Sequence, residues 1–268
     1  MDYKKAVENI RRILKEYVQN AGLKSLVVGQ SGGIDSALCT VLAKPVCDEL
    51  GIQLISRSIT IVTNKPEEFQ RANEIGKYFA HNHKYIDLSD AFHSLEKMVM
   101  EDFENEEHTS FDYRLRLGNV KARTRMIYLY ELASKHKGMV LSTDNYTELL
   151  LGFWTLHGDV GDYGMIQSLW KMEVYGMAKY LASQMENKAA SEALLACVAA
   201  TPTDGLGITN SDLDQIGVSS YAEVDEILQK IELGETAGLE TNKVFIRNRN
   251  SAFKRTNPYN IPRNFIVE

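Results

Sequence analysis

The sequence predicts an α/β protein with a doubly wound, mostly parallel sheet that carries helices on both faces. Short apolar runs of strand length alternate with longer stretches of helical periodicity, which is typical of parallel sheets built from β-α-β units. The first apolar run ends in a glycine-rich turn that leads directly into a helix. A length of 268 residues fits one large domain of this class, so residues 1–268 are expected to form a single domain.

The N-terminal part of the chain predicts a helix, a buried strand and a second helix. An apolar stripe from Tyr3 to Tyr17 recurs every three or four residues, as it does on one face of a helix. The apolar run 23–28 is expected to be a strand. Residues 34–50 are expected to form a helix that Gly51 ends.

Two further strand and helix pairs follow. The runs 52–61 and 85–88 are apolar or β-branched and are expected to be strands. A helix is expected over 66–80, because Pro66 suits the first turn of a helix. Another helix is expected over 89–101.

The pattern continues less regularly in the second half of the chain. Helices over 118–137 and 145–151 are expected to flank a fourth strand, 138–142. Beyond them, helices are expected over 171–185 and 221–231.

Loops at the carboxyl ends of the strands are expected to carry the function. Parallel α/β sheets bind ligands at that edge, so the loops after Val28, Ile61 and Leu141 should lie near one another. Three longer loops are expected to close over the site and exclude water, namely 101–117, 158–168 and 202–211.

Charge and composition exclude several classes of partner. The formal net charge is -6 and no basic stripe is present, so no nucleic-acid partner is expected. No uncharged apolar run approaches the ~20 residues that a membrane span needs, and the N-terminus lacks an apolar signal-peptide core. No membrane partner is therefore expected. The three cysteines, Cys39, Cys47 and Cys197, suit a reducing cytoplasm. His81 and His83 are expected in a solvated surface turn, not as metal ligands.

The glycine-rich turn has the features of a phosphate-binding site. We call Gly29, Gln30, Ser31, Gly32, Gly33, Ile34, Asp35 and Ser36 the phosphate loop. Its glycines let backbone N–H groups approach an anion, and the following helix directs its positive end to the same place. Asp35 beside a phosphate requires a divalent cation, and Mg²⁺ binds through carboxylates, phosphate oxygens and water. The lysine of the other common phosphate loop, Gly-x-x-x-x-Gly-Lys-Ser/Thr, is absent.

The segment Ser31-Gly32-Gly33-Ile34-Asp35-Ser36 is similar to the signature of the N-type ATP pyrophosphatases. This resemblance implies a Rossmann-like adenine nucleotide alpha hydrolase fold. It also implies cleavage of ATP to AMP and pyrophosphate, with the loop holding the pyrophosphate. Members of the superfamily activate a carboxylate or carbonyl oxygen, most of them by adenylation, and a nitrogen or sulfur then attacks. The loop alone leaves the acceptor open.

Two further segments resemble NAD synthetases within that superfamily. The first is Gly-Asn-Val-Lys-Ala-Arg-Thr-Arg-Met at 118–126, which implies that Arg123 contacts deamido-NAD. The second is Ser-Thr-Asp-Asn-Tyr-Thr-Glu at 142–148, which implies that Thr143 contacts ATP. In the same segment the resemblance makes Glu148 a magnesium ligand, together with Asp35 of the phosphate loop.

The family order continues towards the C-terminus. The resemblance assigns Lys171 and Thr203 to ATP. It assigns Asp162, Phe253 and Lys254 to the dinucleotide. The similarity extends over essentially the whole chain, from about residue 5 to residue 263.

Two departures from the family pattern fall in the acceptor part of the site. The family usually has a substrate-contacting lysine after threonine, where this chain has Thr155-Leu156. Phe253 stands where the family usually has histidine.

The resemblance implies an ATP-dependent amidation of deamido-NAD with ammonia, which gives NAD, AMP and pyrophosphate through an acyl-adenylate. Asp35, Glu148 and Lys171 are the expected catalytic residues, Mg²⁺ the expected cofactor and a homodimer the expected assembly. The chain has no room for the glutaminase domain of some synthetases, so direct use of ammonia is expected.

Two alternatives remain open from the sequence. One is a related enzyme that amidates or thiolates another carboxylate or carbonyl, which Leu156 favours. The acidic charge and the lack of a C-x-x-C pair speak against tRNA thiolation. The other is an inactive nucleotide-binding regulator, against which the intact Asp35 and Glu148 argue.

Overall fold

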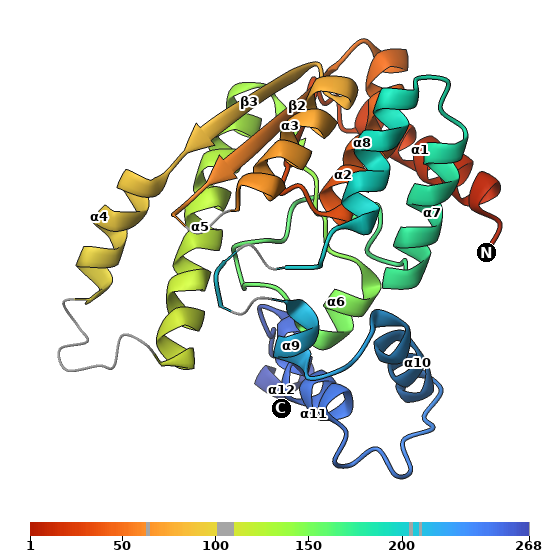
Figure 1. Ribbon diagram of the computed structural model, residues 1–268. Coiled ribbons are helices and arrows are strands. Elements are labelled where there is room, and N and C mark those ends of the chain that lie inside the picture. Colours follow the sequence, from red (N-terminus) through yellow and green to blue (C-terminus); the bar gives the residue numbers. More distant parts are fainter. Residues whose placement is uncertain (63–64, 101–109, 204–205, 209–210, 268) are drawn as a thin grey trace.

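The computed structural model describes residues 1–62, 65–100, 110–203, 206–208 and 211–267. Figure 1 labels most of its elements. In chain order they are α1 (Tyr3–Asn20), β1 (Ser25–Gly29), α2 (Ile34–Leu50), β2 (Gln53–Thr60), α3 (Pro66–Phe79), β3 (Asn82–Asp87), α4 (Ser89–Met100), α5 (Phe111–Lys135), β4 (Gly138–Val140), α6 (Tyr146–Leu151), α7 (Lys171–Ser183), α8 (Lys188–Ala199), α9 (Asp212–Ile216), α10 (Tyr221–Glu232), α11 (Lys243–Asn250), the 3-10 helix η1 (Ala252–Thr256) and α12 (Asn264–Val267).

The sheet contains four described strands in the order β3-β2-β1-β4, and every pair is parallel. The chain runs outwards from β1 to β3 and then returns to the opposite side of β1 as β4. The strand order therefore reverses between β1 and β4, which is the switch point where open α/β sheets bind ligands. The predicted parallel α/β sheet is confirmed.

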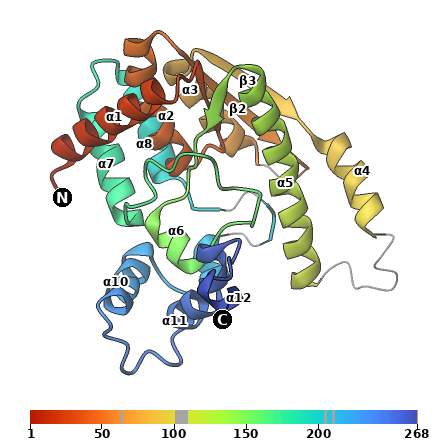
Figure 2. The ribbon, with the colours of Figure 1, turned by 180° about the vertical axis from the view of Figure 1, so that it is seen from behind.

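Helices cover both faces of the sheet, as predicted. Successive strand residues point to opposite faces, so Val28 of β1 packs in the large core formed with α1, α2, α7 and α8. Its neighbour Val27 packs instead with Ile55 of β2, Val140 of β4 and Ala133 of α5. Figure 2, seen from behind, shows α5 crossing that second face.

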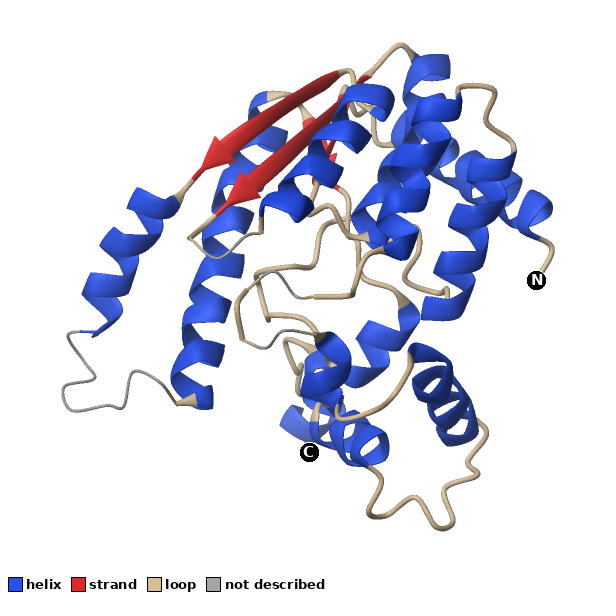
Figure 3. Cartoon of the chain, viewed as in Figure 1, coloured by secondary structure: helices blue, strands red, loops and turns tan. Residues whose placement is uncertain are grey.

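The C-terminal helices form a separate layer beside α6. Leu150 and Leu151 of α6 pack with Val224 and Leu228 of α10 and with Val244 of α11 in a second apolar cluster. Figure 3 shows the loops that follow the strands lying between the sheet and these helices. No helix in the described part of the chain is long and apolar enough to cross a membrane.

Several predicted boundaries are confirmed and others are wrong. The helix predicted over 34–50 is α2 with the same bounds, because Gly33 caps its start and Gly51 ends it with a φ of 64°. The strand predicted at 85–88 is β3 at Asn82–Asp87.

The prediction of a solvated surface turn is wrong for His83, while His81 lies exposed at the bend before β3. His83 lies within β3, half-buried, and its ring nitrogens contact Ser56 and Asn73. His81 Nδ1 accepts from the N–H of Leu54, and its Nε2 lies 2.7 Å from Asp48 Oδ1.

The loops expected to close over the site are only partly loops. The helix predicted from Gly118 begins at Phe111, where Ser110 accepts from the N–H of Tyr113 and caps α5. Residues 101–109, 204–205 and 209–210 of these segments lie outside the described residues. In the segment 158–168, Tyr163 pairs with Leu141 as an isolated parallel bridge, so this part is held against the end of the sheet.

Candidate active site

A cavity of about 550 Å³ opens at the carboxyl ends of β1 and β4. It therefore lies at the switch point of the sheet, where the parallel topology places a ligand. The sequence-predicted residues that line it are Gly29, Gln30, Ser31, Gly33, Ile34, Asp35, Ser36, Thr143, Glu148, Lys171, Thr203 and Lys254. The predicted ATP and metal residues are thus gathered around one space.

Close backbone packing shapes the phosphate loop. Gly32 has a φ of 82°, and a Cβ at this position would lie 2.1 Å from the carbonyl oxygen of Glu68 in α3. Only glycine fits here, for both reasons. Gly33 caps α2 without a side-chain hydrogen bond. The first turn of α2 therefore keeps N–H groups available for an anion.

The polar side chains of the loop bind mainly one another. Gln30 is 2% exposed, and its amide Nε2 donates to Thr40 Oγ1 over 3.0 Å. The hydroxyl of Ser36 accepts from the N–H of Ser31 and donates to Gln30 Oε1. The proton of Ser36 is thus used inside the loop, which leaves its backbone groups as the donors for a ligand.

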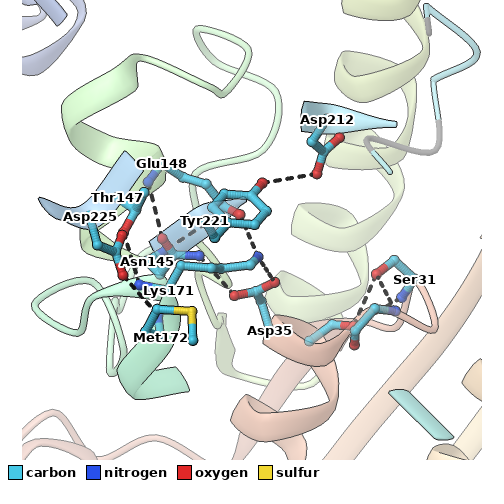
Figure 4. A network of polar contacts seen from close by, with 12 residues as sticks. Ser31, Asp35, Asn145, Thr147, Glu148, Lys171, Met172, Asp212, Tyr221 and Asp225 are labelled. Atoms are coloured by element: carbon cyan, nitrogen blue, oxygen red, sulfur yellow. Dashed lines mark hydrogen bonds and ion pairs between the residues drawn. The ribbon is translucent and has the colours of Figure 1, made fainter. Parts of the chain in front are cut away.

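Lys171 lies between the two predicted metal carboxylates (Figure 4). Its Nζ is 2.6 Å from Asp35 Oδ2 and 2.8 Å from Glu148 Oε1. Burial lowers the pKa of Lys171, but the charges of Asp35 and Glu148 outweigh this and hold it well above its ordinary value. Burial, opposed by the charge of Lys171, raises the pKa of Glu148 to about 7. The three groups form one buried ionic cluster.

The C-terminal layer positions Lys171. Asp225 of α10 accepts from the hydroxyl of Thr147 and from the N–H of Met172. Thr147 in turn accepts from the N–H of Lys171 over 2.9 Å. The ammonium of Lys171 also lies 5.1 Å from the ring centroid of Tyr221. Helix α10 therefore fixes the start of α7 and the side chain that begins it.

Asn145 connects the two carboxylates from the other side. Its Oδ1 accepts from the N–H of Glu148, which makes it the N-cap of α6. Its Nδ2 donates to Asp35 Oδ1 over 2.8 Å. Asn145 is fully buried, so both bonds are protected from water.

The carboxylates fit a divalent cation. Asp35 and Glu148 come from different strand ends, yet both lie within 2.8 Å of one cationic nitrogen. Two converging carboxylates with an adjacent phosphate site match the way in which Mg²⁺ is usually bound. Asp35 and Glu148 are thus the side chains that would hold it.

Asp144 is a buried acid at the wall of the cavity. It is 7% exposed, and it accepts a hydrogen bond from Ser142 Oγ over 3.2 Å. Burial and the negative charge of Glu148 raise the pKa of Asp144 well above its ordinary value. A protonated carboxyl therefore suits this position better than a carboxylate.

Only some of the residues predicted to contact the dinucleotide line the cavity. Lys254 lines the cavity, and its Nζ donates to the carbonyls of Gly152 and Trp154. Phe253 is 60% exposed and lines a neighbouring depression. Their contact with the dinucleotide stays a prediction.

Arg123 and Asp162 are outside the lining of the cavity. Arg123 is exposed, and its Nε donates to the carbonyl of Leu156. Asp162 accepts from the N–H of Val140 over 2.9 Å and from the hydroxyl of Tyr130 over 3.0 Å. Both side chains have structural partners here, and their contact with substrate also stays a prediction.

Several residues at the site were missed from the sequence. Asp225 and Tyr221 support Lys171, while Arg57, Glu68 and Arg71 line the cavity beside the phosphate loop. Only the N-cap spacing of Asn145 and Glu148 gave a local signal, and it indicates a cap, not a link to Asp35.

Comparison with known proteins agrees with this architecture. An NH(3)-dependent NAD(+) synthetase of Methanosarcina mazei is 34% identical over 238 residues, covering 87% of this chain and 84% of that protein. The protein of the same name from Thermoplasma acidophilum is 32% identical and covers 97% of this chain and 98% of its own.

Solved structures give the same picture. NMN synthetase from Francisella tularensis superposes with a TM-score of 0.78 at 25% identity and covers 95% of this chain and 96% of its own. NH3-dependent NAD synthetase from Campylobacter jejuni superposes with a TM-score of 0.72 at 25% identity over 98% of this chain and 100% of its own. The NAD synthase family model matches residues 6–258, and the chain belongs to this family.

Proposed function

We propose that this protein is an ammonia-dependent NAD synthetase, which amidates deamido-NAD at the cost of ATP cleavage to AMP and pyrophosphate. One observation carries the proposal. In a chain of the NAD synthase family, a single cavity brings together the phosphate loop and the Asp35–Lys171–Glu148 cluster. The intact cluster disfavours an inactive regulator.

The first half of the reaction follows from the phosphate loop. The nicotinate carboxylate of deamido-NAD attacks the α-phosphorus of ATP, the α–β bridging bond breaks, and pyrophosphate leaves. N–H groups at the start of α2 are placed to stabilise charge on the leaving group. Mg²⁺ held by Asp35 and Glu148 would neutralise further charge there. Lys171 holds the two carboxylates together.

The second half replaces AMP by nitrogen. Ammonia attacks the acyl carbon, the bond to AMP breaks, and the products are the amide, AMP and one proton. Water competes for the same acyl carbon, so the cavity must exclude it during this step. No side-chain nucleophile is required.

The proposal is tested by incubating the protein with ATP, MgCl₂, ammonium chloride and deamido-NAD. NAD, AMP and pyrophosphate should form in equal amounts, and Asp35→Ala is the inactive control. Glutamine in place of ammonium should support little synthesis. Cleavage of ATP without formation of NAD would contradict the assignment of deamido-NAD as the acceptor, but it would still support the proposed cleavage of ATP.

A second acceptor, nicotinate mononucleotide, has support of its own. The chain superposes on an NMN synthetase with a TM-score of 0.78. In addition, Leu156 replaces a lysine and Arg123 lies away from the cavity lining, so two expected cationic contacts to a dinucleotide are lost or displaced. The ratio of kcat/KM for the two acceptors decides between them.

The proposal includes a homodimer. Apolar side chains are exposed along α4 and α5, among them Met98 at 66%, Phe111 at 44% and Ile127 at 59%. Burying such side chains against a second copy would remove apolar surface from water. Arg123 lies on the same helix, where it could serve a site near the interface. Light scattering after size-exclusion chromatography tests the assembly.

The proposal also places the enzyme in the cytoplasm. Cys39, Cys47 and Cys197 are all buried and free of disulfides. Unpaired thiols of this kind suit a reducing compartment.

A further inference from the structure

Arg71 of α3 touches the phosphate loop directly. Its Nε donates a hydrogen bond to the carbonyl of Gly32 over 2.9 Å, and its side chain lines the cavity. The contact is set by backbone packing, because a Cβ on Gly32 would lie 2.1 Å from the carbonyl of Glu68 and 3.2 Å from the nitrogen of Ala72. The helical turn that carries Arg71 therefore rests on the loop.

Most N–H donors of the Arg71 guanidinium have no hydrogen-bond acceptor among the described residues. A guanidinium carries five N–H donors, and the Nε bond to Gly32 uses one of them. Among the described residues, no carboxylate forms an ion pair with Arg71, and neither Nη has a hydrogen-bond partner. A half-buried cation with four uncommitted donors is thus held at the edge of the cavity.

The charge balance of the site needs such a group. The phosphate loop contains no lysine, and the nearby cation Lys171 is shared by two carboxylates. The ionic cluster therefore carries one net negative charge when both acids are ionised. Pyrophosphate carries several negative charges of its own. A guanidinium is well suited to it, because its planar donors read phosphate oxygens in pairs.

Arg57 does not replace Arg71 in this role. It also lines the cavity, but its Nη1 donates to the carbonyls of Ser56 and Asn82 and to Asn82 Oδ1. These bonds turn that end of the guanidinium towards β2 and β3. The carbonyl of Arg57 accepts a backbone hydrogen bond from the N–H of Gln30 over 2.8 Å, but within the described residues its guanidinium forms no hydrogen bond with the phosphate loop.

We propose that Arg71 binds the phosphate chain of ATP and stabilises pyrophosphate as it leaves. The inference rests on the ATP half of the proposed function and is independent of the acceptor. Arg71 is then a cation supplied to the loop by a neighbouring helix, in the place of a lysine within the loop itself.

The test compares two products by calorimetry on the full-length protein. Inorganic pyrophosphate with MgCl₂ reports on the phosphate site, and AMP reports on the nucleoside site. For Arg71→Gln we expect pyrophosphate to bind about 10-fold more weakly, a loss of about 1.4 kcal/mol, while AMP affinity stays within about twofold. Arg71→Lys keeps the positive charge without the paired donors, so its pyrophosphate affinity should lie between those of the wild type and Arg71→Gln. Arg12→Gln, on the surface of α1, is the matched control.

Chemical rescue separates binding from bracing of the loop. In Arg71→Ala, a few millimolar guanidinium chloride should restore part of the pyrophosphate affinity and leave AMP affinity unchanged. If Arg71 only braced Gly32, free guanidinium could not restore the loop, because it is not anchored to α3, and the pyrophosphate affinity of Arg71→Ala would stay low. Equal weakening, or unchanged pyrophosphate affinity in Arg71→Gln, overturns the inference.

The acceptor assignment can fail without affecting this result, because neither ligand requires an acceptor. Absence of NAD synthesis together with the expected loss in Arg71→Gln would keep the inference and remove only the acceptor. A wild-type protein that does not bind pyrophosphate at all would overturn both the inference and the ATP site.

Discussion

Asn145 Nδ2 donates a hydrogen bond to Asp35 Oδ1 over 2.8 Å, across 110 positions of the sequence. The same side chain caps α6 by accepting from the N–H of Glu148. One buried amide thus fixes the relative position of the two carboxylates proposed to hold Mg²⁺.

Asn145→Asp separates these two functions. The new carboxylate can still cap α6, but it cannot donate to Asp35, and it adds a like charge to the cluster. Loss of an outer partner of a metal ligand typically costs 10–100-fold in metal affinity or activity. We expect a loss of about that size in kcat, with a higher Mg²⁺ concentration needed for half-maximal rate. Steady-state rates over a MgCl₂ series measure both.

The control for Asn145→Asp is Asn187→Asp, the same change at the N-cap of α8. It alters a cap away from the ionic cluster and should leave the Mg²⁺ dependence as in the wild type. Equal kinetic effects of the two substitutions would mean that the bond to Asp35 has no part in the reaction.

Lys171→Met tests the charge balance of the cluster. The substitution leaves Asp35 and Glu148 buried without their cation, and breaking a buried ion pair in this way costs about 3–5 kcal/mol. We expect a marked fall in the free energy of unfolding. Mg²⁺ should recover more stability in this variant than in the wild type, because it supplies the missing positive charge. Thermal unfolding with and without MgCl₂, at constant ionic strength, measures the recovery.

Lys179→Met, on the exposed side of the same helix, is the comparison for Lys171→Met. It should change stability little, with or without MgCl₂. If Mg²⁺ shifts the melting temperature of all three proteins equally, Asp35 and Glu148 are not its ligands.

The sequence predicts helices and strands correctly where residues that begin or end an element are easy to identify. Helix α2 matches its predicted bounds because Gly33 and Gly51 mark both ends. The start of β3 was predicted three residues too late, because among the described strands β3 pairs only with β2 and is half exposed, so its Asn-His-Lys start is not apolar. The Ala-rich helix α8, with its small side chains, carries too weak a periodic pattern to be recognised.

The site follows from the sequence only in its local parts. The phosphate loop is contiguous, so its glycines and Asp35 could be identified directly. The support of Lys171 could not, because Asp225 lies 78 positions from Thr147, and no local pattern joins them. Arg71 presents the same difficulty, since in sequence it is one more charged residue of a surface helix.

Asp144→Asn should make the protein less sensitive to alkaline pH. The pKa of Asp144 is raised in the folded state, so the folded protein binds more protons than the unfolded one above the ordinary aspartate value of about 3.9. Stability contributed by this group is therefore lost as the pH rises from that value towards the folded pKa. Each unit of the shift corresponds to about 1.4 kcal/mol. Asparagine keeps the contact with Ser142 and removes the titration.

Melting temperatures of the ligand-free protein between pH 5 and pH 8.5 check this expectation for Asp144→Asn. The advantage of the variant over the wild type should grow with pH. Asp90→Asn is an exposed change in the first turn of α4, and its melting temperature should vary with pH as that of the wild type does. An advantage that shrinks as the pH rises would contradict the raised pKa.

Arg11 compensates for a proline inside α2. Pro45 has no N–H, so the carbonyl of Val41, four residues earlier, lacks its helical partner. Arg11 of α1 supplies a donor, with its Nη2 3.4 Å from that oxygen. Arg11→Met should lower the free energy of unfolding by about 1 kcal/mol, since it leaves a buried carbonyl without a partner.

A double-mutant cycle with Pro45→Ala tests whether this loss comes from the Val41 carbonyl. Alanine restores an N–H at position 45, and this group can donate to Val41 within the helix. Arg11→Met should then cost clearly less in the Pro45→Ala background, because the oxygen already has a partner. Chemical denaturation of the four proteins gives the coupling energy. A cost of Arg11→Met that is the same in both backgrounds would assign it to lost packing of the arginine side chain, because only the hydrogen bond depends on the residue at position 45.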